Sequence, residues 1–222
     1  MAGLDRRYPV ELIDVVRLRG GSRVTIRPAL PQDLAINQAF VLGLSDGARR
    51  SRFLAPVGGL TDDQARRFTD IDYCRHLALI AEVFVGGSEI MVAEARYVIE
   101  DSADCCEFAL AILDDWQGKR LGRYLMSRLI ERARAAGVRR IFGDTLRDNA
   151  AMLALGRQLG FAVRPHPADP RLYRLVLDLD SDAAERHGGT TTYPTASEIP
   201  APKQVAAAIP AIAMSAPSSP AA

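Results

Sequence analysis

The 222-residue sequence has only three cysteines, Cys74, Cys105 and Cys106. An odd number argues against a framework of disulfide bonds, and no pair has the spacing of a zinc site. Cys105 and Cys106 are neighbours in a predicted strand, so their side chains point to opposite faces of a sheet. We therefore expect thiols without a catalytic role, and a protein that needs no metal.

Long hydrophobic runs are absent too, since no stretch of about 18 apolar residues could form a transmembrane helix. The first residues of the chain lack the apolar core of a secretory signal peptide. A net charge of +1 gives no excess of either sign that would attract nucleic acid or a membrane surface. These absences predict a cytoplasmic protein without nucleic-acid or membrane partners.

Apolar residues make up 48% of the chain, which is enough for one substantial domain. The composition changes after Asp180, because residues 181–222 hold six of the thirteen prolines and show no hydrophobic period. Such a segment cannot bury enough apolar surface to offset the entropy lost on ordering. The sequence predicts one folded domain over residues 1–180 and a disordered tail over residues 181–222.

The pattern of apolar residues in residues 1–180 alternates between strand and helix periods, as in an α/β domain. Gly20-Gly21 indicates a hairpin between strands at 15–19 and 23–27, and Thr61 to Gln64 resembles a capping box. The other predicted strands are 77–85, 89–99, 107–113, 138–144, 161–164 and 172–179. The predicted helices are 31–44, 61–70, 119–136 and 149–159.

The most informative segment is a strand–loop–helix junction at residues 113–125. Gly118 and Gly122 in its loop allow a ligand to approach the backbone closely. The helix that follows presents unpaired N–H groups and a positive dipole end, which favour an anion. The loop adds three basic side chains, Lys119, Arg120 and Arg123. The segment predicts a phosphate-binding site, although it has neither a P-loop nor a dinucleotide-binding glycine pattern.

Gln117, Arg120 and Gly122 follow the pattern Gln/Arg-x-x-Gly-x-Gly/Ala, with Arg120 in place of the middle glycine. The pattern resembles the acyl-CoA pyrophosphate loop of the GNAT acetyltransferases. The resemblance implies their α/β fold, a mixed, mostly antiparallel twisted sheet of about seven strands with helices on both faces and a V-shaped splay that holds acyl-CoA. It implies acetyl-CoA as the acyl donor, bound by Leu113, Gln117, Gly118, Lys119, Arg120, Leu121, Gly122, Arg123 and Asn149.

Further segments between residues 8 and 180 resemble one subgroup, the acetyltransferase domain of bacterial protein lysine acetyltransferases. Among them are Tyr8-Pro9, Arg52-Phe53, Phe68 to Tyr73, Glu107 to Ala109 and Trp116 to Gly118. The resemblance implies transfer of acetyl to a protein lysine. Two alternatives stay open, acetylation of a small amine and a non-catalytic acyl-CoA sensor. A homodimer is compatible with all three.

Glu107 is the candidate general base, because attack by an amine requires a proton acceptor and a glutamate at this place serves as base in the resembling subgroup. From its position alone, Glu107 would be an exposed carboxylate at the start of a strand. Glu94, in an apolar stretch of the neighbouring strand, is the reserve candidate. In the family a backbone N–H of the strand before the loop polarises the acetyl carbonyl, and we expect Leu113 to supply it.

Asn149 opens the helix predicted at 149–159, where it is either a helix cap or, as in the family, a ligand of the CoA arm. Many relatives carry a tyrosine seven residues further on, which protonates the departing thiolate. Gly156 occupies that place here. The resemblance therefore implies a thiolate that leaves without help from this acid.

Overall fold

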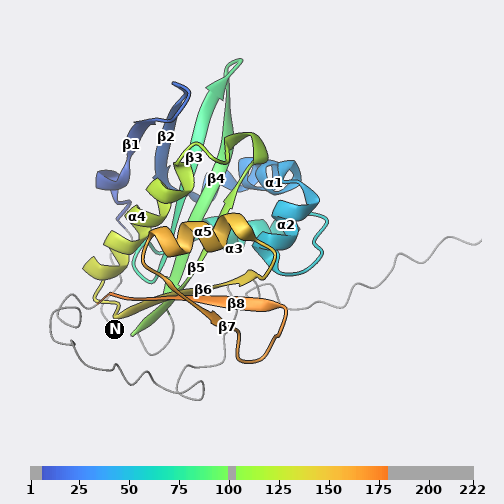
Figure 1. Ribbon diagram of the computed structural model, residues 1–222. Helices are drawn as coiled ribbons and strands as arrows, with labels where there is room; N and C mark the ends of the chain where they lie inside the picture. Colours follow the sequence, from blue (N-terminus) through green and yellow to red (C-terminus); the bar gives the residue numbers. More distant parts are fainter. Residues whose placement is uncertain (1–6, 100–103, 180–222) are drawn as a thin grey trace, which may run out of the picture.

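The computed structural model describes residues 7–99 and 104–179 (Figure 1). The tail predicted at 181–222 lies outside the described residues. Within them, no helix is both long enough and apolar enough to cross a membrane.

The described strands form one eight-stranded sheet in the order β1-β2-β3-β4-β5-β6-β8-β7. Every neighbouring pair is antiparallel except β5 and β6, which are parallel. The strands are β1 (Asp14–Arg17), β2 (Arg23–Pro28), β3 (His76–Val85), β4 (Ser88–Ile99), β5 (Cys105–Ile112), β6 (Arg140–Leu146), β7 (Ala162–Pro165) and β8 (Leu172–Asp178).

Helices cover both faces of the sheet, and each face has its own apolar core. On one face lie α1 (Leu34–Gly43), α2 (Asp46–Phe53) and α3 (Asp62–Thr69), which pack with Ile80 and Ala111 of the sheet. On the other lie α4 (Leu121–Ala135) and α5 (Ala150–Gln158). Figure 1 shows α4 and α5 crossing in front of the strands. Short 3₁₀ turns occur at Val10–Leu12, Pro31–Asp33 and Asp114–Trp116.

The predicted fold class is confirmed, and the predicted strands and helices lie close to the observed ones. The capping box is present, with the Thr61 side chain accepting the Gln64 N–H and the Gln64 side chain accepting the Thr61 N–H. The sheet has eight strands instead of about seven. The sequence prediction missed α2 entirely, and this helix forms one wall of the site described below.

The parallel strands β5 and β6 pair only at their beginnings, from Cys105–Arg140 to Glu107–Phe142. Beyond this point the Phe108 ring lies against Gly143, where even a Cβ atom would come within 2.7 Å of the ring. The ring also packs edge-on against Phe161, at 5.3 Å between centroids. The Phe108 ring therefore acts as a wedge where the strands separate, and the predicted V-shaped splay is confirmed.

Candidate active site

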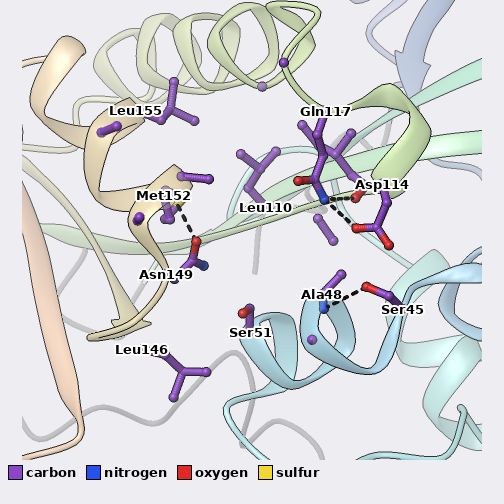
Figure 2. Close-up of a pocket in the computed structure, with 18 of the residues that line it drawn as sticks. Ser45, Ala48, Ser51, Leu110, Asp114, Gln117, Leu146, Asn149, Met152 and Leu155 are labelled. Carbon is purple, nitrogen blue, oxygen red and sulfur yellow. Dashed lines mark hydrogen bonds between the residues drawn. The ribbon is translucent and has the colours of Figure 1, made fainter.

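A cavity of about 1010 Å³ occupies the space where β5 and β6 separate. Its walls are α2, the end of β5 with the loop that follows, and the beginning of α5. Figure 2 shows Gln117 and Asp114 on one side, Asn149 and Met152 on the opposite side, and Ser51 below them. A volume of this size is at the upper end of the range for small-molecule sites, so it suits a long ligand.

Hydrogen bonds from Gln117 fix the start of the loop. Its Nε2 donates to the Ile112 carbonyl at 3.1 Å and to Asp114 Oδ1 at 2.9 Å. Gly118 and Arg120 both have left-handed backbones, with φ of 70° and 71°. Arg120 thus adopts the conformation expected of the glycine that it replaces, at a cost of about 1–2 kcal/mol for a residue with a Cβ.

The loop leads into α4, whose first turn opens on the cavity. The first N–H groups of a helix have no partner within it, and the side chain of the N-cap residue Arg120 does not bond to those of α4, so they can meet an anion. Of the predicted loop residues, the cavity is lined by Gln117, Gly118, Arg120, Gly122 and Arg123. The side chains of Lys119 and Leu121 lie elsewhere, the first over the Trp116 ring and the second in the core.

The prediction that the Leu113 N–H polarises the acetyl carbonyl is wrong, because this N–H donates to the Val92 carbonyl of β4 at 3.0 Å. Successive N–H groups of a strand point in opposite directions, so Leu110 and Ile112 direct theirs to the side where β6 has moved away. The bond from Gln117 to the Ile112 carbonyl agrees with this direction. This edge of β5 therefore presents the N–H groups of Leu110 and Ile112 to a ligand.

Asn149 is a helix cap, because its Oδ1 accepts the Met152 N–H at 3.0 Å. It also lines the cavity, where its amide group faces the space between α5 and α2 (Figure 2). A Cβ at Gly156 would meet the Leu175 side chain at 3.1 Å, so this position packs against β8. Asn149 can serve the helix and a ligand together.

Glu107 lies at the closed end of the split, in a narrow recess of about 40 Å³ next to the main cavity. The two share Ser51, Leu110, Asn149 and Met152 in their walls. Glu107 is only 6% exposed, so the expectation of an exposed strand-end carboxylate is wrong. Its position suits a group that meets the reactive end of a ligand bound along β5.

Glu94 is placed differently from Glu107, in a buried network of ion pairs. It is paired with Arg96, and its Oε2 lies 3.6 Å from Arg52 Nη2. Arg96 in turn donates to the Phe68 carbonyl at 3.1 Å. Glu94 lines neither the cavity nor the recess, so Glu107 is the better-placed candidate base.

The sequence prediction missed the contribution of α2, which brings Ser45, Ala48 and Ser51 to the cavity. One local signal for this helix was present, because the Ser45 side chain caps it by accepting the Ala48 N–H at 3.3 Å.

The acetyltransferase (GNAT) family model matches residues 50–161, from α2 to the residue that follows Gly160. An acetyltransferase of Pseudomonas aeruginosa is 33% identical over 165 residues, which cover 73% of this chain and 89% of that protein. The chain belongs to the GNAT acetyltransferase family. It is therefore an acetyl-CoA-dependent acetyltransferase.

Two further proteins are similar to this chain. Acetyltransferase Pat of Mycolicibacterium smegmatis is 31% identical over 146 residues, 65% of this chain, and the match spans 43% of the length of Pat. The GNAT domain of S. lividans PAT superimposes with a TM-score of 0.70 at 27% identity, covering 78% of this chain and 100% of that domain. The likeness found in the sequence therefore extends to a solved structure of a GNAT domain.

Proposed function

We propose that this GNAT enzyme transfers acetyl from acetyl-CoA to the side-chain amine of a protein lysine, by direct attack with Glu107 as general base. The observation that carries the proposal is the burial of Glu107 at the closed end of the split, beside the cavity for the cofactor. The resemblance of segments between residues 8 and 180 to the bacterial protein lysine acetyltransferases supports lysine as the acceptor.

The reaction needs a neutral amine, and a lysine with a pKa of about 10.4 is charged at pH 7. Deprotonation at that pH costs about 4–5 kcal/mol, so a positioned carboxylate gives a large advantage. Glu107 takes one proton of the ammonium, and the neutral amine attacks the acetyl carbonyl. The C–S bond then breaks, acetyl passes to nitrogen, and the departing CoA thiolate takes, through water, the second proton that the nitrogen loses as the amide forms.

The free edge of β5 supplies the electrostatic part of the mechanism. The diphosphate of acetyl-CoA lies against the Gln117 to Arg123 loop and the first turn of α4, with Asn149 beside the CoA arm. The arm runs along β5 toward Glu107, so that the N–H of Leu110 or Ile112 donates to the acetyl oxygen. Such a donor stabilises the negative charge that develops on this oxygen in the transition state.

The small volume of the recess favours a slender acceptor. A lysine side chain is an unbranched stem of four carbons with the amine at its end, and it can reach a buried carboxylate without bringing its backbone into the cleft. A bulky amine would have to widen the walls formed by Ser51, Leu110 and Met152.

The test of the acceptor class is CoA release measured with the full chain, acetyl-CoA and a panel of amines at equal concentration. We expect lysine-containing peptides to exceed polyamines, amino acids and aminoglycosides by at least about tenfold in kcat/KM, which corresponds to about 1.4 kcal/mol of transition-state binding. Mass spectrometry should place the acetyl group on the lysine Nζ.

Two results would contradict the proposal. Faster turnover of a small amine, with the peptides unmodified, would make this a small-molecule acetyltransferase. Tight binding of acetyl-CoA without CoA release for any amine would make it an acyl-CoA sensor. The Glu107→Gln variant, tested in the same panel, shows whether any release observed depends on the proposed base.

A further inference from the structure

Four buried charged side chains gather on the sheet face covered by α2. The register of β4 against β5 puts Glu94, Arg96 and Glu107 on this face, and Arg52 reaches them from α2. Each is at most 6% exposed. Two positive and two negative groups are therefore buried together on this face.

Glu94 and Arg96 compensate each other's buried charge through their direct ion pair. Arg96 also donates to the Phe68 carbonyl, and its guanidinium lies 4.1 Å from the centre of the Phe68 ring. Arg96 is thus held by groups other than Glu107.

Arg52 is held less completely. In the described part of the chain neither its Nη1 nor its Nη2 makes a hydrogen bond, and its nearest carboxylate oxygen in an ion pair is that of Glu94, at 3.6 Å. Burial lowers the pKa of Arg52 to about 10, and the negative charge of Glu107 opposes this effect. Opposite charges attract, so a buried guanidinium beside Glu107 favours the charged form of its carboxyl.

Arg52 and Glu107 also share the walls of the narrow recess beside the cavity. We propose that Arg52 is a positioning residue that keeps the Glu107 carboxyl ionised, and so ready to accept the proton of the attacking amine. The proposal rests on the proposed role of Glu107 as general base. It gives this fully buried arginine a role in the reaction without contact to the substrate.

The other charged groups around Glu107 are each bound to a partner. On β6, Asp144 lines the recess, but Arg174 binds both of its oxygens at 2.8 and 2.9 Å. His166 also lies 3.2 Å from Asp144. His76 Nε2 lies 3.1 Å from Arg96 Nη1, and burial lowers the pKa of His76 to about 3, so its ring is neutral. The helix α4 packs against the opposite sheet face, whereas Arg52 lines the recess together with Glu107.

The experiment measures two midpoints in the full chain. The first is the acidic limb of kcat/KM against pH with a lysine peptide. The second is the titration of the Glu107 carboxyl followed by NMR of ¹³C-labelled glutamate, with the resonance assigned from its absence in Glu107→Gln. Removal of an opposite charge at close range raises the pKa of a carboxyl, so Arg52→Gln should move both midpoints up by about one pH unit or more.

Two variants serve as controls for general damage to the buried cluster. Arg52→Lys keeps the charge and should leave both midpoints near those of the wild type. Glu94→Gln also removes one buried charge, but of the opposite sign, so it should move both midpoints to lower pH. If Arg52→Gln does not fold, as judged by circular dichroism, these two variants decide the question.

The possible results separate this inference from the assignment of the base. Arg52→Gln with lower activity at every pH and unmoved midpoints would overturn the role of Arg52, as would an unchanged or higher midpoint in Glu94→Gln. A carboxyl titration that moves while the kinetic limb stays fixed would support the coupling of Arg52 to Glu107. It would show at the same time that Glu107 is not the base.

Discussion

Glu107→Gln should lower turnover with a lysine peptide by about 10²- to 10⁴-fold at pH 7, while the affinity for acetyl-CoA changes little. Glutamine keeps the size of the side chain and some of its hydrogen bonding, but it cannot accept the proton of the amine. The rate of the variant should recover in part at high pH, where the amine is deprotonated in solution. Steady-state rates from pH 7 to 10 and calorimetric titration with acetyl-CoA check this.

Glu94→Gln is the matched control, because Glu94 lies on the same sheet face but outside the cavity and the recess. It should keep its turnover at pH 8, once circular dichroism has shown that it is folded. A near-normal rate in Glu107→Gln together with a lost rate in folded Glu94→Gln would transfer the role of base to Glu94. Normal rates in both would point to an acceptor that arrives neutral, such as a small amine of low pKa.

Gly122→Asp should weaken the binding of acetyl-CoA by about 100-fold. Gly122 stands in the first turn of α4, where its Cβ would meet Ile112 Cδ1 at 3.0 Å and Leu110 Cδ2 at 3.4 Å. A carboxylate there would face the diphosphate, and two like charges about 4 Å apart near a protein surface repel by several kcal/mol. Isothermal titration of the folded variant with acetyl-CoA measures the loss.

Gly122→Asn separates charge from bulk, since asparagine has the same shape without the charge. We expect Gly122→Asn to bind more weakly than the wild type but clearly more tightly than Gly122→Asp, and the gap between them to shrink at high salt. Equal affinities of the two variants would show that the loop does not face the diphosphate.

The parts of the fold that the sequence predicted well are those set by local signals. The hairpin at Gly20-Gly21, the capping box at Thr61 and the helix that follows the glycine loop all depend on neighbouring residues. The amphipathic pattern of α4 is also local, because its apolar face is read from residues three and four apart.

The features that the sequence did not predict, the helix α2 and the burial of Glu107, depend on long-range packing. The α2 segment Asp46–Phe53 contains three arginines and few apolar residues, so its periodicity does not indicate burial. Yet Arg52 and Phe53 are buried, because Glu94 and Phe68 from distant segments surround them. The burial of Glu107 likewise follows from the position of α2, which its own strand cannot reveal.

The direction of the Leu113 N–H has a simpler cause. A shift of one residue along a strand reverses the direction of the N–H group, and that direction is set by the register of β5 against β4. Sequence patterns locate the strand but leave this register open. The resemblance thus pointed to this strand, but the register decides which of its N–H groups face away from β4.

A crystal structure of the full chain with acetyl-CoA would show whether the cofactor brings its acetyl group to Glu107. We expect the diphosphate at the amides of the Gln117 to Arg123 loop and the arm along the edge of β5 that faces away from β4. We also expect the acetyl oxygen within about 2.7–3.2 Å of the backbone nitrogen of Leu110 or Ile112, with the acetyl carbon facing the recess of Glu107. Acetyl-CoA bound outside the split between β5 and β6, or bound there with its acetyl group turned away from Glu107, would contradict the proposed mechanism.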